Sequence, residues 1–376
     1  MPLKLPPIAK VGDALNLVSS PALLIDLDVF ESNIQQMADL SRRHKIALRP
    51  HAKAHKSTAI AKAQLASGAV GICCQKLSEA YPFALAGINS IHISNQFVGA
   101  SKVAMAVDLA RHVSLSVCVD HVAQIAALGT AATQAGVCIG VLPEVDVGQG
   151  RCGVSNPDDL VKLIDGISKH DGLKFGGLQA YHGGAQHIAP WEQRQQAAHQ
   201  SADLTAGYLK HLVARGIQCE IVTGGGTGTV EFDVASGIYN EIQPGSYVFM
   251  DRSYGANEWR RTLQLRHSLF IVSTIMSTAK TGQVVCDLGL KGVAIDSGMP
   301  LVTSDEHQQS LQYIAANDEH GIIEVLGDKE RDRLGERVLL IPGHCDPTAN
   351  LYKQYVGYRQ NKVECLWDIE ARGLSQ

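Results

Sequence analysis

The chain has 376 residues, of which 45% are hydrophobic and 19% charged, so it is long enough for a barrel with a smaller domain and intrinsic disorder is excluded. The formal net charge is −4 and the pI is near 6.4, so no basic nucleic-acid surface is expected. The apolar runs are shorter than the ~20 residues of a membrane-spanning helix, and the N-terminus lacks a signal-peptide pattern. We expect a cytoplasmic protein that binds neither nucleic acid nor membrane, and whose nine cysteines are reduced thiols.

Short apolar runs alternate with amphipathic stretches through the first two thirds of the chain. Helical spacing is clear after the first run, where Phe30, Ile34 and Met37 share one face and Asp28 with Glu31 forms a candidate capping box. Eight strand-then-helix units predict an α/β chain with a (β/α)8, TIM-like barrel, whose chemistry lies at the C-terminal ends of its strands. The predicted strands, apolar at consecutive positions as burial on both faces requires, are 22–28, 46–53, 71–76, 90–95, 114–120, 140–147, 175–181 and 220–224.

Beyond about residue 265 the pattern changes to short runs rich in Val and Ile, punctuated by Gly, Asp and Pro. Such runs predict a mostly antiparallel β domain, with strands at 269–277, 283–288, 322–326, 337–341 and 362–369. We expect the barrel to cover 18–265 and the β domain 266–376, with residues 1–17 as a candidate addition to the β domain.

The segment RPHAKAHK, from Arg49 to Lys56, ends the second predicted strand and crowds five basic residues together. Neighbouring positive charges disfavour protonation of a lysine amine, and a neutral amine can form a Schiff base with an aldehyde. Lys53 would lie at the strand end and Lys56 at the start of the next helix. A solvated basic loop is the alternative interpretation.

Three consecutive glycines follow the eighth predicted strand, and Thr227 and Thr229 add hydroxyl donors. The backbone N–H groups of such a loop can approach a phosphate closely, and barrels often bind phosphate after strands seven and eight. The pattern predicts a phosphate site with a second wall from Gln243 to Tyr247. A plain flexible turn is the alternative.

In the predicted β domain, His344 and Asp346 are two residues apart in a segment expected to be extended, so their side chains should point the same way and Cys345 away. Nitrogen and oxygen donors suit Mn²⁺, Zn²⁺ or a related ion. Two ligands leave the other positions to water or substrate. A turn with a His–Asp hydrogen bond explains the pattern equally well.

Two further loops carry candidate residues. Arg151, on a glycine-flanked loop, could reach an anionic or phenolic oxygen. His182 and His187, after the seventh predicted strand, are candidates for proton transfer, although loop histidines are often merely exposed. The polar segment 317–321 either lines the site or forms a turn.

In combination, these motifs resemble the fold-type III pyridoxal-phosphate enzymes, the alanine-racemase-like group, and within it the low-specificity D-threonine aldolases. The resemblance covers about residues 20–373 and rests on RPHAKAHK, GICCQK, HISN, EVDVGQGRCGV, LQAYHG, TGGGTG, GSYVFMD, YGANEW, NDEHG and PGHCDPT. The 3-hydroxy-D-aspartate aldolases and metal-dependent D-serine dehydratases share most of these motifs. The dehydratases carry His-x-Cys where this chain has His344 and Asp346, which favours an aldolase.

The resemblance implies a carbon–carbon lyase that cleaves D-threonine and other D-β-hydroxy-α-amino acids to glycine and an aldehyde. It implies pyridoxal phosphate and a divalent metal, with Mn²⁺ preferred and Mg²⁺, Co²⁺, Ni²⁺ or Zn²⁺ as alternatives, in a homodimer. Lys53 would be the Schiff-base lysine and Arg151 would contact the cofactor ring, with His187 as a candidate base. His344 and Asp346 would hold the metal. The phosphate would be surrounded by Gly225, Gly226, Thr227, Gly245, Ser246 and Tyr247.

The sequence leaves three alternatives open. Alanine racemases place an arginine where this chain has Thr223, so the partner of the ring nitrogen is open, with Tyr181 as a candidate. A non-catalytic pyridoxal-phosphate carrier would lack the β domain and the His344/Asp346 pair. A barrel metallohydrolase would need metal ligands on several barrel strands.

Overall fold

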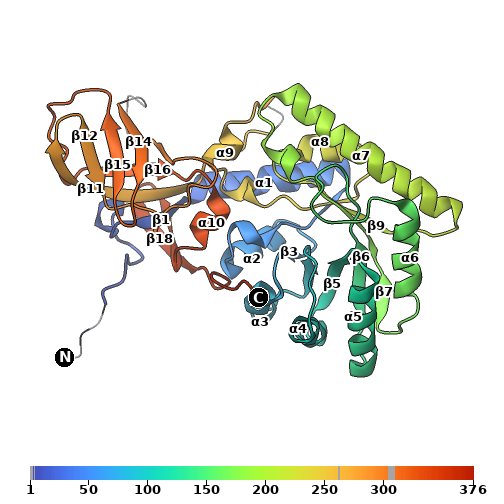
Figure 1. Cartoon of the computed structure of the whole chain (residues 1–376). Coiled ribbons are helices and arrows are strands. Elements are labelled where there is room, and N and C mark those ends of the chain that lie inside the picture. The colour runs from blue at the N-terminus through green and yellow to red at the C-terminus, as the bar shows by residue number, and fades with distance from the viewer. Residues whose placement is uncertain (1–2, 4, 261–262, 304–309) are drawn as a thin grey trace.

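A computed structural model describes residues 3, 5–260, 263–303 and 310–376. The chain forms a barrel surrounded by helices and a β domain, with α1 (Leu27–His44) running between them (Figure 1). Short 3-10 turns are η1 (Leu15–Leu17), η2 (Ala52–Ala54), η3 (Gly184–His187) and η4 (Ser246–Val248). Within the described residues, no helix has the length and apolar character needed to cross a membrane.

Parallel strands form the barrel in two ladders, β3–β4–β5–β6–β7 and β2–β10–β9–β8. Isolated parallel bridges, His51 to Cys73 and Glu144 to Gln179, join the two ladders and close the barrel. β7 pairs with β6, and after Gly176 the chain continues as β8, which pairs with β9 from Gly177 onward. β7 and β8 therefore occupy one strand position of the barrel together. The strands are β2 (Ala47–Leu48), β3 (Ile72–Cys74), β4 (Ser90–Ile93), β5 (Ser114–Val119), β6 (Ile139–Pro143), β7 (Leu173–Phe175), β8 (Gly177–Ala180), β9 (Ile221–Gly224) and β10 (Glu241–Ile242).

Helices cover the outside of the barrel. α1 buries Phe30, Ile34 and Met37, as its periodicity predicts, but its N-cap is Asp26, whose Oδ1 accepts from Val29 N at 3.1 Å, and not Asp28. The other helices are α2 (Thr58–Ala66), α3 (Leu77–Leu85), α4 (Ala100–Ala110), α5 (Val122–Ala135), α6 (Pro157–Ile167), α7 (Trp191–Ala214), α8 (Val230–Ala235) and α9 (Arg252–Gly255).

The β domain is built on one mixed sheet. Its central path is β14–β15–β12–β11–β1–β17–β18, with β16 paired to β11 and β13 paired to β16. All pairs are antiparallel except β1 with β17. The elements are β1 (Ala22–Asp26), β11 (Leu269–Lys280), β12 (Gln283–Cys286), β13 (Leu301–Val302), β14 (Leu311–Ala316), β15 (Gly321–Val325), β16 (Arg337–Ile341), α10 (Cys345–Ala349), β17 (Gln354–Arg359) and β18 (Lys362–Asp368).

The predicted fold class is confirmed, but the assignment of one strand is wrong. The run 22–28, predicted as the first barrel strand, is β1 of the β domain, where it lies between β11 and β17. The eighth strand of the barrel is instead β10, a two-residue strand that no apolar run in the sequence predicts. A strand buried on both faces has the same pattern in either sheet, so the sequence could not separate them. As a result, RPHAKAHK follows the first barrel strand and the glycine loop follows the seventh.

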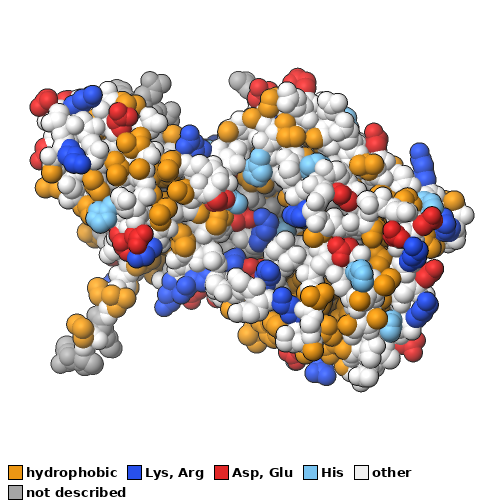
Figure 2. Space-filling model, in the orientation of Figure 1, with side chains coloured by type: hydrophobic (Ala, Val, Ile, Leu, Met, Phe, Trp, Pro, Cys, Tyr) orange, Lys and Arg blue, Asp and Glu red, His pale blue; other side chains and the backbone are white. Residues whose placement is uncertain are grey.

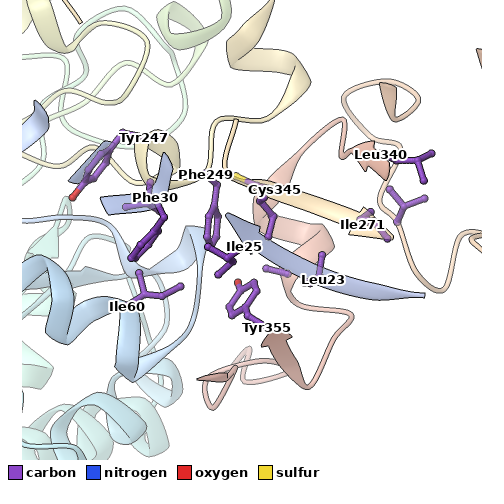
Figure 3. Close-up of a cluster of buried hydrophobic side chains, with 14 of the residues drawn as sticks. Leu23, Ile25, Phe30, Ile60, Tyr247, Phe249, Ile271, Leu340, Cys345 and Tyr355 are labelled. Atoms are coloured by element: carbon purple, nitrogen blue, oxygen red, sulfur yellow. The ribbon is translucent and has the colours of Figure 1, made fainter. Parts of the chain in front are cut away.

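One hydrophobic core joins the two bodies. It contains Phe30 of α1, Tyr247 and Phe249 after β10, and Leu340 and Tyr355 of the β domain (Figure 3). The rings of Phe249 and Tyr355 are 5.5 Å apart. This packing fixes the β domain against the barrel mouth.

Candidate active site

A cavity of about 220 Å³ opens at the C-terminal ends of the barrel strands, where the fold predicts chemistry. In the space-filling view, basic, acidic and histidine side chains gather in a hollow between the two bodies (Figure 2). The cavity is lined by residues from several strand ends, namely His51, Lys53, Gln75, Ser94, Arg151, Gln179, Tyr181, Gly226, Thr227, Gln243, Gly245, Ser246 and Tyr254.

Lys53 lies in η2, the next element after β2, and its Nζ forms an ion pair with Asp346 of α10. Burial opposes the charged amine most strongly, but the Asp346 carboxylate, together with Tyr181 and Cys345, raises the pKa of Lys53 overall. The prediction that neighbouring cations lower the pKa of Lys53 is therefore wrong. The basic residues near Lys53 in the chain do not act as a cluster of unpaired cations. Burial lowers the pKa of His51 to about 3, so His51 is neutral, and Lys56 pairs with Glu79.

His344 and Asp346 come together at the start of α10. His344 is the N-cap and Asp346 lies in the first turn, so the predicted extended segment is wrong, yet His344 Nε2 is 4.0 Å from Asp346 Oδ1. His344 Nδ1 lies 2.7 Å from Asp296 Oδ2, which leaves Nε2 free to face Asp346. Burial tends to raise the pKa of Asp346, but Lys53 and His344 lower it overall, so this carboxyl is ionised. In the described part of the chain, no three His, Cys, Asp or Glu side chains are grouped to hold a metal ion.

The glycine loop between β9 and α8 is shaped by a buried glutamine. Oε1 of Gln186 accepts from Gly228 N at 3.0 Å, and Nε2 of Gln186 donates to Thr229 Oγ1 at 2.8 Å. A Cβ at Gly226 would lie 2.5 Å from Gln186 Oε1, so only glycine fits there without displacement. Thr227 Oγ1 is buried without a hydrogen-bond partner among the described residues and borders the cavity, so its donor is available to a bound group.

Asp233 of α8 supports the same loop from behind. It accepts from Thr229 Oγ1 at 2.6 Å and from the Gly226 backbone. Burial raises the pKa of Asp233 to about 7, more than these hydrogen bonds lower it. Gly225, with φ +67°, makes the turn, and a Cβ at this position would lie 2.5 Å from Asp233 Oδ2. Gly225 is not among the residues that line the cavity.

The opposite wall carries Arg151 and Tyr181. The Arg151 guanidinium lies 5.5 Å from the centre of the Tyr181 ring, and its Nη2 is 3.9 Å from Glu144 Oε1. Below them, the Gln179 and Gln243 amides donate to each other, at 3.2 and 2.8 Å. Gln243 Nε2 also donates to Thr223 Oγ1 at 2.8 Å, so neutral groups form this part of the site.

His187, at the end of η3, lines a groove beside the cavity and does not line the cavity itself. Its Nδ1 lies 2.9 Å from Ser253 Oγ, and its ring packs 4.7 Å from that of Tyr254, which does line the cavity. His182 is used differently, since its Nδ1 accepts from Ala185 N at 3.2 Å and caps the turn. The 317–321 segment is a hairpin end between β14 and β15, where Asp318 and Glu319 pair with Lys291.

Family models match both parts of the chain. Residues 25–253 match the alanine racemase N-terminal domain, and residues 268–358 match the putative serine dehydratase domain. The chain is 47% identical to a D-threonine aldolase of Arthrobacter sp., over 100% of this chain and 98% of that one. It is 39% identical to a 3-hydroxy-D-aspartate aldolase of Paracoccus denitrificans (strain Pd 1222), over 95% of this chain and 92% of that one. The crystal structure of D-threonine aldolase from Filomicrobium marinum superposes with a TM-score of 0.95 at 41% identity, covering 99% of this chain and 100% of that chain.

The chain belongs to the D-threonine aldolase family of fold-type III pyridoxal-phosphate enzymes. In this member of the D-threonine aldolase family, the side chains of two predicted phosphate residues have partners within the protein. Tyr247 is fully buried beside Phe30, and its hydroxyl accepts from Gln64 Nε2 at 3.2 Å (Figure 3). The Ser246 hydroxyl donates to Asp346 Oδ1 at 3.3 Å. Both residues lie in the short 3-10 turn η4, whose side-chain directions a spacing argument does not predict.

Several residues of the D-threonine aldolase cavity were not assigned a role from the sequence. Those at strand ends could have been found from their positions alone, because C-terminal strand ends form the site of a barrel. They are His51, Gln75, Ser94 and Gln179. No pattern in the sequence points to Asp296, because it lies in an irregular segment far from His344 in the chain.

Proposed function

We propose that this chain is a pyridoxal-phosphate- and divalent-metal-dependent aldolase that cleaves D-threonine and other D-β-hydroxy-α-amino acids to glycine and an aldehyde. The observation that carries the proposal is the ion pair between Lys53 of the barrel and Asp346 of the β domain. It joins the candidate Schiff-base amine to the candidate metal-ligand pair, so a substrate amine that replaces Lys53 Nζ would lie beside both halves of the site.

The cavity fits pyridoxal phosphate, and this fit supports Lys53 as the lysine that binds its aldehyde. Gly226, Thr227, Gly245 and Ser246, which line the cavity, would hold the phosphate, with Gly225 and the Tyr247 backbone next to them in the chain. The unpartnered Thr227 hydroxyl and the tight glycine positions favour this assignment. Arg151 and Tyr181 would contact the ring. When bound, the cofactor supplies an electron sink for the bond that breaks.

His344 and Asp346 would hold the divalent ion, with Mn²⁺ preferred and Mg²⁺, Co²⁺, Ni²⁺ or Zn²⁺ as alternatives, and substrate or water would fill the remaining positions. A divalent ion supplies Lewis-acid stabilisation of a hydroxyl oxygen. His187 Nε2 would take the proton of the substrate β-hydroxyl, while Ser253 holds Nδ1. Burial lowers the pKa of His187, which keeps this base neutral. Asp346 in place of the dehydratase cysteine supports aldol cleavage.

We also propose that the protein is a cytoplasmic homodimer that binds neither nucleic acid nor membrane. All nine cysteines lie in the described residues as free thiols, as is usual in a reducing compartment, and the net charge is −4. The groove beside His187 is lined by Leu301, Ile314 and Leu326, which are 43%, 41% and 51% exposed and could be covered by a second copy. Light scattering of the cofactor-loaded protein measures the oligomeric state.

Product analysis tests the proposed activity. The cofactor-loaded protein is incubated with D-threonine, D-serine or 3-hydroxy-D-aspartate, with Mn²⁺ or with chelator, and products are followed by NMR. We expect glycine and acetaldehyde from D-threonine, loss of both after chelation, and recovery on adding Mn²⁺. Lys53→Ala serves as the inactive control. Pyruvate and ammonia from D-serine without cleavage of D-threonine would identify a dehydratase, and full cleavage after chelation would contradict the metal role.

A further inference from the structure

A second lysine of RPHAKAHK, Lys56, is buried at the junction of the two domains. It is 9% exposed and has φ +52°, a left-handed conformation that is unfavourable for a residue with a side chain. Its Nζ donates to Asn350 Oδ1 at 2.9 Å and pairs with Glu79 Oε1 at 2.9 Å. Lys56 thus leaves the cavity to Lys53 and directs its own amine into the junction.

The contacts of Lys56 reach both halves of the site. Its backbone N donates to Ala52 O at 2.7 Å, which closes the turn that carries Lys53. Asn350 is the C-cap of α10, and its N–H donates to Asp346 O at 3.4 Å. One side chain therefore connects the turn of the Schiff-base lysine to the helix of the metal-ligand candidates.

Other contacts already hold the domains together at this place. Tyr355 OH donates to His55 O at 2.8 Å, and Ala371 N donates to Lys56 O at 3.1 Å. Glu370 accepts from Thr58 N and Thr58 Oγ1, at 3.0 and 2.6 Å. Lys53 and Ser246 contact α10 at Asp346 itself, whereas the Lys56 amine reaches the C-terminal end of the helix, where Gly373 N also donates to Asn350 Oδ1 at 2.8 Å. Loss of the Lys56 contact should therefore shift the end of α10 without separating the domains.

We propose that Lys56 is a positioning residue which, through Asn350, sets the place of Asp346 relative to Lys53. This inference rests on the proposed metal role of Asp346. Glu79 holds the Lys56 amine from the barrel side, where it also accepts from Gln75 N and Lys76 N, at 3.0 and 3.1 Å. The buried Glu79 and the carbonyl-type oxygen of Asn350 together satisfy the amine at a fixed point.

Metal binding to the cofactor-loaded protein tests this role. Lys56→Met, Asn350→Ala and the double variant are titrated with Mn²⁺ by calorimetry, with the absorbance of the bound cofactor, kcat, KM and Tm recorded for each. We expect each single variant to weaken Mn²⁺ binding about tenfold, as loss of an outer contact to a ligand does, with lower kcat and unchanged cofactor absorbance. The double variant should be no weaker than Asn350→Ala, because that change already removes the contact with Lys56, together with the acceptor of Gly373 N.

Two further variants separate positioning from general stability. Glu370→Ala cuts a neighbouring link between the domains and should lower Tm while Mn²⁺ affinity stays within twofold of the wild type. Asn350→Asp keeps an oxygen acceptor and should restore most of the affinity lost in Asn350→Ala. Additive losses in the double variant, or equal losses in Glu370→Ala, would overturn the proposal. A wild-type protein that binds no Mn²⁺ would contradict the proposed function as well, whereas wild-type binding with unaffected variants would contradict the role of Lys56 alone.

Discussion

His344 illustrates how a single hydrogen bond can decide what an imidazole does. Its Nδ1 is engaged by Asp296 Oδ2 at 2.7 Å, so Nε2 is the nitrogen that faces Asp346. A carboxylate on the far nitrogen of a metal-binding histidine fixes its tautomer and raises its basicity. Asp296 therefore belongs to the proposed metal site although it does not reach its centre.

We expect Asp296→Asn to weaken Mn²⁺ binding by roughly 10- to 100-fold, because the amide cannot hold the imidazole as firmly. The absorbance of the bound cofactor should not change, since Asp296 does not line the cavity. Calorimetric titration measures the affinity. Asp318→Asn, an exposed acid of the same domain that pairs with Lys291, is the control for charge. Wild-type affinity in Asp296→Asn would show that the hydrogen bond has no role in metal binding.

Asp233 makes the stability of the protein depend on pH. Its pKa rises from 3.8 to about 7 on folding, chiefly through burial. Below pH ~4 the carboxyl is neutral in both states; between pH ~4 and ~7 it ionises only when unfolded, so stability falls as pH rises. Asn does not titrate, so the free energy of unfolding of Asp233→Asn should rise relative to that of the wild type between pH ~4 and ~7, by an amount on the order of a few kcal/mol. Above pH ~7 the difference between the two proteins should be constant.

Urea unfolding of the cofactor-free wild type and Asp233→Asn at pH 4 and pH 8 measures this difference. Asp171→Asn, at an exposed position, controls for the loss of a charge. The same difference in unfolding free energy at both pH values would mean that Asp233 is ionised in the folded protein.

At the scale of elements, the glycine loop depends on contacts from η3 as much as on its own glycines. Gln186 binds Gly228 N and Thr229 Oγ1, and it leaves no room for a Cβ at Gly226. The loop is therefore tied to η3 by hydrogen bonds, which the plain flexible turn considered as its alternative would lack.

We expect Gly226→Ala to weaken binding of pyridoxal phosphate at least tenfold, because the new methyl group must displace Gln186 and with it the backbone N–H groups of the loop. Fluorescence titration of the cofactor-free protein measures the affinity. Gly207→Ala in α7, where a Cβ meets nothing within 4 Å, should leave the affinity unchanged and stabilise the protein by ~0.5–1 kcal/mol. Unchanged affinity in Gly226→Ala would remove this loop from the proposed phosphate site.

At the scale of the whole molecule, the β domain is assembled from two distant parts of the chain. β1 lies between β11 and β17, with Ile25 opposite Leu269 and Asp26 opposite Tyr358. The predicted boundary at 266 therefore leaves out a central strand, whose absence would expose the edges of both neighbours.

A fragment of residues 266–376 should therefore show no cooperative thermal transition by circular dichroism. Joining residues 1–26 in front of it through a short glycine–serine linker should produce one, because the end of β1 lies beside the start of β11. A cooperative transition in the shorter fragment would show that the sheet does not need β1.

The sequence by itself determined the types of element and the chemistry of the motifs. Runs of apolar residues, a glycine loop and a histidine–carboxylate pair are local patterns, and their order along the chain indicates the family. The sequence could not assign β1 to its sheet, because a strand buried on both faces has the same pattern in either sheet. It could not predict β10 either, because two residues are too few to show a periodicity.

Only the tertiary structure decided how charges are distributed in the site. RPHAKAHK reads as a cluster of cations, but Asp346 and Glu79 neutralise its two lysines, and burial keeps His51 neutral. Lys53 and Asp346 are 293 positions apart, and no local rule of spacing connects them. The physical reason is that burial and Coulomb interactions act through space, so the protonation of each group depends on neighbours that the fold brings from elsewhere in the chain.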